Sequence, residues 1–544
     1  MPPIRPRAEL DTHQVSNQPP PLPSYNAFAD DPLMRPPGLD DPEALALLGE
    51  FGARCGGEAA RELGRLANEN PPRLRAFDRY GQRLDEVEFH PAYHQLMALG
   101  LGHGVSSRAW THPAQGHTAH AVLMMLMTQV DSGVTCPMSM TYAVVPALAT
   151  ADWAAQEWRP RVTTPDYDQR SAPAGEKSAA TMGMAMTEKQ GGSDVRANTT
   201  RAEAIGGGDE ALLVGHKWFC SAPMSDAFLT LAYEDAGLSC FLVPRWRPDG
   251  TRNAIEVMRL KDKLGDRSNA SAEIEYHHAW ARRVGEPGRG LATIIQMVQL
   301  TRFDCVLGSA GLMRRALTEA LWHAQHRTAF QRRLIDQPLM AAVLADVVVE
   351  TEAAMALAWR LGAALEARGD AREALTARLM TPAAKYWVTK RCPTVVGECL
   401  EAMGGGGYVE EAPMPRLFRQ SPLNAIWEGS GNVIALDVQR AVANEPGTLD
   451  AAREELASVA GVYPALDALA SELAGLPKAS AAEMRRGVER LAIAFQAAAL
   501  IRTAPGFVAD AFVAMRIAQP AFQFGASGAA IDHRAILDRA AVPG

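Results

Sequence analysis

Glu428 is the side chain best placed for chemistry, because it stands between an apolar run and a Gly-Ser-Gly break. The run Ala425–Trp427 should be buried, and a carboxylate is seldom buried without a partner or a chemical task. Gly429 and Gly431 allow the main chain to come close to a ligand. Asn432 is expected to cap the helix that follows. The alternative is a polar loop in which Glu428 is solvated.

Two earlier stretches carry groups that suit a flat or anionic ligand. The loop Thr187–Val195 combines glycines, hydroxyls and a carboxylate. Its backbone N–H groups and hydroxyls could bind a polar ring edge or a phosphate, although an ordinary hairpin loop would look similar. The strand Lys217–Ser221 places Trp218 beside small polar residues, where the indole either fills a core or stacks on a cofactor.

Two later stretches complete the set. Arg327 could bind a phosphate and Phe330 could lie on an aromatic ring; the alternative is a surface arginine and a core phenylalanine. Four consecutive glycines, Gly404–Gly407, stand before Tyr408 at the end of a helical pattern. They permit close backbone approach to a ligand or to another subunit.

The elements that must position these residues form an α+β fold that is mainly α. Residues 1–40 are rich in proline and predict an extended arm, lying over another surface or partly disordered. An N-terminal helical domain is expected over 41–180. Its helical patterns are Pro42–Phe51, Gly57–Glu69, His90–Gly100, His117–Thr128 and Met138–Arg159.

Short apolar runs separated by glycine over 181–285 predict a central antiparallel β-domain of about seven strands, with a tight turn at Gly215-His216. The helical period returns over 286–444 and predicts a C-terminal bundle with stretches near Leu291–Arg327, Gln337–Arg368, Arg372–Met403 and Asn432–Ala443. Residues 445–544 are rich in alanine and predict an additional helical domain, with a capping box at Ser480–Glu483.

Composition narrows the class of protein. The 544 residues carry a net charge of −8, so bulk electrostatics do not favour nucleic acid or an anionic membrane. Seven scattered cysteines without a Cys-x-x-Cys pair indicate reduced thiols, with no metal site. The proline-rich N-terminus lacks the apolar core of a signal peptide, and no apolar run is long enough to span a bilayer. We therefore expect a cytoplasmic protein without a membrane partner.

Taken together and in order, these stretches resemble the acyl-CoA dehydrogenase family of flavoproteins. The family pattern runs from a Thr-Glu-x-x-x-Gly-Ser-Asp loop and a Lys-Trp strand to Arg-x-x-Phe, Gly-Gly-x-Gly-Tyr and Tyr-Glu-Gly-Thr segments. The matching segments are Thr187–Asp194, Lys217–Trp218, Arg327–Phe330, Gly404–Tyr408 and Trp427–Ser430, with further matches at Lys263–Ser268 and Val284–Gly290. The resemblance spans about residues 90–443.

The exact residues of several segments resemble those of the AidB branch of that family. Met186–Val195, Trp427–Asn432, the motif Asn17-Gln18-Pro19 and the added tail all match it. The branch belongs to the bacterial adaptive response to DNA alkylation. The resemblance implies FAD binding, a homotetramer, and double-stranded DNA binding through the tail.

The resemblance also implies roles for particular residues. The loop near Thr187 would wrap the flavin ring, Trp218 would stack near it, and the stretch around Glu428 would line flavin and thioester. Arg327, Phe330 and the glycine turn would meet the adenine and pyrophosphate end of FAD from a neighbouring subunit. The implied cofactor-binding residues are Met184, Ala185, Met186, Thr187, Glu188, Gln190, Gly191, Gly192, Ser193, Trp218, Phe219, Cys220, Ser221, Arg327, Phe330, Gly404, Gly405, Ile426, Trp427, Gly429, Ser430, Gly431 and Asn432.

Glu428 stands where most of the family keep the catalytic base, which takes a proton α to a thioester carbonyl. A minority place the base just before an arginine in the first long helix after the β-domain. The matching pair here is Thr301-Arg302, which offers no carboxylate. Arg440, further along the helix after Glu428, could keep that carboxylate ionised or meet an anionic ligand; the alternative is a surface arginine.

Some positions depart from the family. Gln331 replaces a family glycine, Pro338 aligns with the FAD-binding glutamine, which leaves Gln337 one place early, and Glu401 replaces the glutamine before the glycine turn. The adenine end of the FAD site is therefore expected to be rearranged.

The tail holds nine Lys/Arg against eleven Asp/Glu, a net charge of −2, which is a weak footprint for DNA. DNA binding would need its arginines on one face, the candidates being Arg485, Arg486, Arg490, Arg502 and Arg516. The alternative is a solvated helix surface.

The sequence thus predicts an FAD-dependent enzyme that dehydrogenates an acyl-CoA or similar thioester between Cα and Cβ. One alternative is a DNA-binding protective flavoprotein with little turnover. Another is an oxidase-like enzyme that passes electrons to oxygen.

Overall fold

A computed structural model describes residues 7–112, 114–445 and 447–542. The described part of the predicted N-terminal arm, 7–40, packs on the chain itself and includes a short 3-10 helix, Pro32–Met34. Leu22, Phe28 and Met34 are buried in the main core. Asp41 caps the first long helix by accepting from Ala44 N at 3.0 Å. The helices of this part are α1 (Pro42–Cys55), α2 (Glu58–Glu69), α3 (Pro91–Gly102), α4 (Arg108–Thr111), α5 (Gly116–Val130) and α6 (Ser132–Ala143).

The single helix predicted over 138–159 is wrong. The chain instead forms α6, α7 (Val145–Leu148), α8 (Asp152–Glu157) and α9 (Arg159–Val162). Pro146 and Pro160 each stand in the first turn of a new helix, because proline cannot donate the hydrogen bond that would continue the old one. A two-stranded hairpin, β1 (Arg73–Phe77) and β2 (Arg83–Glu88), was not predicted.

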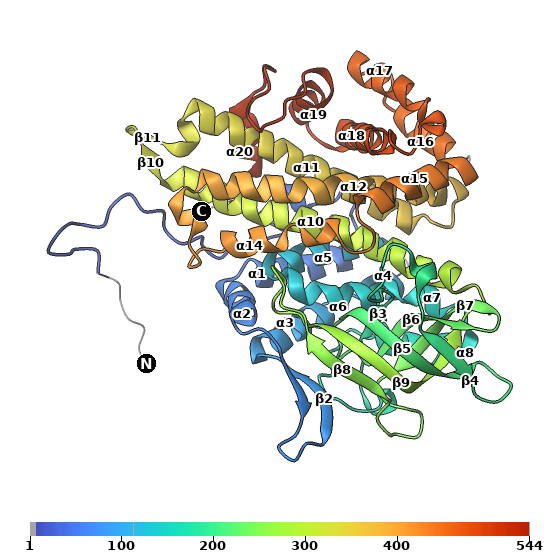
Figure 1. Ribbon diagram of the computed structural model, residues 1–544. Helices are drawn as coiled ribbons and strands as arrows, with labels where there is room; N and C mark the ends of the chain where they lie inside the picture. Colours follow the sequence, from blue (N-terminus) through green and yellow to red (C-terminus); the bar gives the residue numbers. More distant parts are fainter. Residues whose placement is uncertain (1–6, 113, 446, 543–544) are drawn as a thin grey trace.

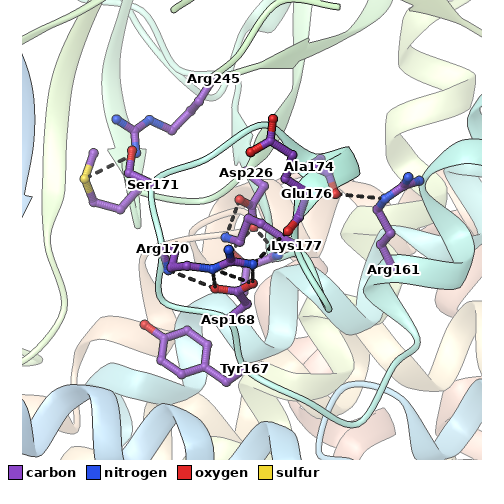
Figure 2. A network of polar contacts seen from close by, with 12 residues as sticks. Arg161, Tyr167, Asp168, Arg170, Ser171, Ala174, Glu176, Lys177, Asp226 and Arg245 are labelled. Carbon is purple, nitrogen blue, oxygen red and sulfur yellow. Dashed lines mark hydrogen bonds and ion pairs between the residues drawn. The ribbon is translucent and has the colours of Figure 1, made fainter. Parts of the chain in front are cut away.

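A linker joins these helices to the sheet and is held by ion pairs. Asp168 binds Arg170 at 2.6 Å and Asp226 binds Lys177 at 2.6 Å, as Figure 2 shows. Asp226 Oδ2 also accepts from Thr181 N at 2.8 Å. The strand that begins at Met182 is thereby fixed to the strand that begins at Ala227, with which it pairs.

The β-domain is one sheet of seven strands, as predicted. The strands are β3 (Met182–Ala185), β4 (Arg201–Ala204), β5 (Glu210–Ser221), β6 (Ala227–Glu234), β7 (Gly237–Pro244), β8 (Ile255–Leu260) and β9 (Ser271–Val284). Their order is β3-β6-β4-β5-β9-β7, with β8 on β9, and a β6–β7 pairing closes the sheet on itself. Most pairs are antiparallel, but β3 and β4 each run parallel to β6.

The predicted turn at Gly215-His216 is wrong, because β5 runs straight through it. Gly215 has φ +155°, and a Cβ there would meet Thr200 Oγ1 at 2.4 Å. Gly215 therefore allows β5 to pass close to Thr200, and it does not form a turn.

The bundle is built from α10 (Gly290–His326), α11 (Pro338–Glu366), α12 (Ala371–Ala402) and α15 (Gly431–Asn444), close to the predicted bounds. The hairpin β10 (Thr328–Ala329) and β11 (Arg332–Arg333) joins α10 to α11, and α13 (Gly405–Tyr408) and α14 (Met414–Gln420) follow α12. In Figure 1 the yellow and orange bundle helices lie between the green sheet and the red tail.

The tail consists of α16 (Gly447–Ala457), α17 (Pro464–Leu473), α18 (Met484–Thr503), α19 (Gly506–Val513) and α20 (His533–Ala540). It shares one hydrophobic core with the bundle and the N-terminal helices. Arg516 pairs with Asp346 at 2.5 Å and Glu350 at 2.6 Å on α11. Helix α18 begins at Met484, so Glu483 rather than Ser480 is its N-cap, although Glu483 accepts from Ser480 N at 2.9 Å.

All seven cysteines are free and buried, in agreement with the prediction of reduced thiols. Among the described residues, no helix is both long and apolar enough to cross a membrane.

Candidate active site

The loop that carries Glu428 joins a single turn, Leu423–Ala425, to α15. Trp427 Nε1 donates to Asn424 Oδ1 at 2.9 Å, which fixes the indole. Glu428 has φ +58° and Gly429 has φ +106°. A left-handed glutamate is uncommon and costs energy, and such strain persists only where the surroundings enforce it.

Two buried cations enforce the conformation of this loop. Arg302 Nε on α10 donates to Glu428 O at 3.0 Å, and Lys385 Nζ on α12 donates to Gly429 O at 2.8 Å. Arg302 is in turn paired with Asp437 on α15 at 2.7 Å. Helices α10 and α12 thus hold the carbonyl groups of Glu428 and Gly429, and α15 holds Arg302 in turn.

The Glu428 carboxyl group is poised for proton transfer. Its Oε2 is buried and has no hydrogen-bond partner within the described residues. Burial raises the pKa of Glu428, while the Thr301 hydroxyl and the charges of Lys385 and Arg302 oppose that rise. Burial is the largest of these effects, so the pKa of Glu428 is raised overall. A carboxylate with a raised pKa is suited to act as a base near neutral pH.

Three expectations around Glu428 need correction. Ile426 is 64% exposed, so the run before Glu428 is not wholly buried. The N-cap of α15 is Ser430, and Asn432 instead accepts from Arg485 Nη1 of the tail at 3.3 Å. The Arg440 side chain is 61% exposed and lies 3.7 Å from Asp437, so Arg302 and Lys385 are the cations that contact the Glu428 loop.

Glu188 shapes the predicted cofactor loop and offers no free acceptor to a ligand. It accepts from Lys217 Nζ at 2.9 Å, Thr199 N at 2.7 Å and Thr200 N at 3.1 Å. Burial would raise the pKa of Glu188, but the charge of Lys217 and these hydrogen bonds lower it to about 2. Gln190 Nε2 is also used internally, donating to Glu188 Oε2 at 2.8 Å.

Gly192 and Ser193 are exposed, as are Lys189, Gln190 and Asp194 of the same loop. Gly192 packs so closely that a Cβ there would meet Thr187 Oγ1 at 2.5 Å. Thr187 O accepts from Trp218 N at 2.8 Å, which brings the loop and the Trp218 strand together as predicted. The Trp218 ring is half-buried, with Lys261 Nζ at 3.3 Å from its centroid.

Several predicted cofactor residues have side chains that are buried or already in contact within the protein. The side chains of Met184, Ala185 and Cys220 are buried in hydrophobic cores. Phe219 is 50% exposed, Met186 is partly buried against the core, and Ser221 Oγ lies 3.4 Å from Ser271 Oγ.

Arg327 and Phe330 lie far from Glu428 in this chain. Arg327 follows the end of α10, and Arg302 lies on the same helix, so the two are about 37 Å apart along the helix axis. The Phe330 side chain is 92% exposed, so it is not a core residue. Gly404 has φ +59°, and a Cβ on Gly405 would meet nothing within 4 Å. Arg327 is therefore too far from its own Glu428 to act beside it.

The sequence did not single out Lys385. Arg302 was considered only because a minority of the family place the catalytic base just before the matching arginine. The available signal was a lysine inside the apolar helical run Ala383-Ala384-Lys385-Tyr386, where a buried charge needs a purpose.

The tail arginines are mostly bound to carboxylates. Arg486 and Arg490 contact Glu472 at 3.1 and 3.3 Å, and Arg502 contacts Glu455. Arg516 is buried between Asp346 and Glu350. Arg485 instead contacts the Tyr386 hydroxyl at 3.2 Å and Asn432 Oδ1 at 3.3 Å. Four of the five candidate arginines are thus bound to carboxylates of the described chain.

Comparisons with known proteins agree with this architecture. The family model "Adaptive response protein AidB N-terminal domain" matches residues 17–169, and the middle and C-terminal domains of acyl-CoA dehydrogenases match 183–279 and 288–443. The sequence is 46% identical to putative acyl-CoA dehydrogenase AidB of Escherichia coli (strain K12), over 83% of this chain and 84% of that protein. The chain belongs to the acyl-CoA dehydrogenase family.

Other acyl-CoA dehydrogenases extend the likeness to nearly the whole chain. Acyl-CoA dehydrogenase family member 11 of Caenorhabditis elegans is 32% identical over 78% of this chain and 72% of that protein. The crystal structure of C. elegans ACDH-11 in complex with C11-CoA covers 98% of this chain and 93% of that one, with a TM-score of 0.83 and 27% identity. The predicted family and fold class are therefore confirmed.

FAD is the cofactor of acyl-CoA dehydrogenases, and the residues present fit such a group. The exposed main chain of Gly192 and Ser193 offers donors to a polar ring edge, and Trp218 beside it offers an aromatic surface. The unpartnered Oε2 of Glu428 is a group of the kind that proton transfer needs.

Proposed function

We propose that this protein is an FAD-dependent dehydrogenase that oxidises the Cα–Cβ bond of an acyl-CoA thioester. The observation that carries the proposal is the buried, unpartnered Oε2 of Glu428 on a strained loop that Arg302 and Lys385 hold. Support for the substrate class comes from a relative of similar fold solved with C11-CoA.

In the proposed reaction Glu428 accepts the proton from Cα of the thioester. FAD, when bound, accepts the hydride from Cβ. Arg302 and Lys385 keep the loop in place, because moving either carbonyl would move the carboxyl group. The buried setting excludes water from the base and keeps it basic enough to take a weakly acidic proton.

We also propose that the protein is a homo-oligomer, with a tetramer as the expected state. Arg327 lies about 37 Å along α10 from Arg302, so it can contact a cofactor only at a neighbouring subunit's site. The exposed Phe330, at 92%, and Tyr408, at 78%, suit burial in such an interface.

A link to the DNA alkylation response is proposed on the match to the adaptive response protein domain at residues 17–169. Buried free thiols fit a reducing compartment such as the cytoplasm.

The direct test is an anaerobic titration of the purified, FAD-loaded protein with saturated acyl-CoAs of several chain lengths. We expect the visible flavin absorbance to bleach, with one range of chain lengths preferred. A protein that cannot take up FAD, or whose bound flavin no acyl-CoA bleaches, would refute the proposal. Rapid reoxidation of the reduced flavin by air would favour the oxidase-like alternative.

A further inference from the structure

The hairpin between α10 and α11 is strained and poorly supported by its own residues. Its strands hold two residues each, and its turn is formed by Phe330 and Gln331, with φ +50° and +65°. Both turn positions are left-handed, which asparagine and glycine tolerate and which phenylalanine and glutamine adopt at a cost. The aromatic ring at the apex is 92% exposed. An isolated hairpin of this length does not hold its shape in water.

The N-terminal arm supplies the missing support through Asn17. Its side-chain amide pairs with Thr328 as another strand would. Asn17 Nδ2 donates to Thr328 O at 2.8 Å, and Asn17 Oδ1 accepts from Thr328 N at 2.8 Å and from Thr328 Oγ1 at 2.7 Å. Asn17 itself has φ +54°, a left-handed conformation that asparagine tolerates.

The same arm segment binds the neighbouring arginine and helix. Arg327 Nη1 donates to the main-chain carbonyl of Asn17. Trp322 Nε1 on α10 donates to Pro20 O at 2.8 Å. From the other side, Gln337 Nε2 donates to Ala329 O at 2.8 Å. The hairpin is therefore clamped between the arm and the start of α11.

This clamp accounts for two departures from the family pattern. Gln331 replaces a glycine that would adopt the turn without strain, and the arm offsets that strain by bonding Thr328. Gln337 is used to bind Ala329 O and precedes α11, so it is not free for a ligand. Strain that tertiary contacts maintain at an exposed apex is typical of functional segments.

We propose that Asn17 is a positioning residue for the FAD site, which clamps the hairpin so that Arg327 and Phe330 meet the diphosphate and adenine of the dinucleotide bound at a neighbouring subunit. The inference rests on the proposed function. It gives the N-terminal arm a role in cofactor retention, and no chemistry of its own. Arg327 keeps a second guanidinium nitrogen, Nη2, for the anionic ligand.

The test compares FAD binding by the full-length apoprotein of wild type, Asn17→Ala and Gln18→Ala, measured by flavin fluorescence titration. Gln18 is the matched control, because it is an adjacent exposed amide on the same arm. We expect Asn17→Ala to weaken FAD binding about tenfold, with Gln18→Ala like wild type. Hydrogen exchange of the Thr328 amide should accelerate in Asn17→Ala only.

A double-mutant cycle with Arg327→Ala separates positioning from a general loss of stability. If Asn17 acts through Arg327, Asn17→Ala should weaken FAD binding little further in an Arg327→Ala background. Equal FAD affinity of Asn17→Ala and Gln18→Ala, or fully additive losses, would overturn the inference and leave the proposed function intact. Failure of wild type to bind FAD would refute the proposed function itself.

Discussion

At the scale of single residues, the sequence singles out Glu428 but not the cations that contact its loop. A carboxylate between an apolar run and glycines indicated a site, and the order of family segments indicated its role. The sequence suggested Arg440 as its cation, because that residue follows on the same helix. The cations instead come from α10 and α12, which are remote in sequence. Single-sequence patterns do not report such tertiary contacts.

Lys385 should set the pH at which the base works. Its positive charge lowers the pKa of Glu428 against the effect of burial. Removing that charge in Lys385→Met should raise the pKa of Glu428 further, so the rise of flavin-bleaching rate with pH should move to higher pH. Above both pKa values a pH-independent loss of rate should remain, because the variant also lacks the contact of Lys385 with Gly429 O. The measurement is the bleaching rate by stopped flow across pH.

Lys385→Arg is the matched control for that experiment. It keeps the positive charge, so its pH profile should stay close to that of wild type. A Lys385→Met variant that is slower by the same factor at every pH would contradict the electrostatic role and leave Lys385 a purely structural residue.

At the scale of elements, long helices were predicted well because their apolar period persists over many turns. Helix α10 was expected from Leu291 to Arg327 and runs from Gly290 to His326. The prediction failed where one residue overrides the period, as at Pro146 and Pro160. The β1–β2 hairpin was missed because its exposed, short strands carry little apolar alternation.

The ion pair of Glu188 and Lys217 should be a stability determinant of the loop that precedes β4. Lys217 is 1% exposed, so Glu188→Gln leaves an unpaired buried ammonium group. We expect a loss of about 3–5 kcal/mol in the free energy of unfolding at pH 7, measured by urea denaturation. The double variant Glu188→Gln/Lys217→Met should recover part of this loss.

The pH dependence of that loss has a defined sign. The pKa of Glu188 is lowered in the folded state, to about 2. Its contribution to stability is therefore present above the unfolded-state pKa and is lost as pH falls toward 2. The stability difference between wild type and Glu188→Gln should shrink over the same interval. A difference that grows on acidification would contradict the assignment.

At the scale of the whole molecule, the tail is part of the body of the protein. It shares the bundle's core, and Arg516 and Arg539 pair with carboxylates on α11. Composition predicted its helices but not this integration, because the partners lie more than a hundred residues away in sequence. Its net charge of −2 and its paired arginines give little positive potential.

Duplex DNA should therefore bind weakly and lose binding with salt. In fluorescence anisotropy with the full-length protein, we expect any binding at about 50 mM salt to vanish by about 200 mM. Arg486→Glu/Arg490→Glu should change little, because both arginines already contact Glu472. Tight binding that survives the higher salt and is lost in this variant would show that the tail does bind DNA.

The most direct test of the account is the anaerobic single-turnover bleaching of bound FAD by a preferred acyl-CoA in wild type, Glu428→Gln and Glu157→Gln. Glu157 is an exposed glutamate on α8, outside the proposed site, and serves as the control. We predict that Glu428→Gln binds FAD and acyl-CoA but bleaches roughly a hundredfold to ten-thousandfold more slowly, while Glu157→Gln matches wild type. An unchanged bleaching rate in Glu428→Gln would contradict the assignment of the base.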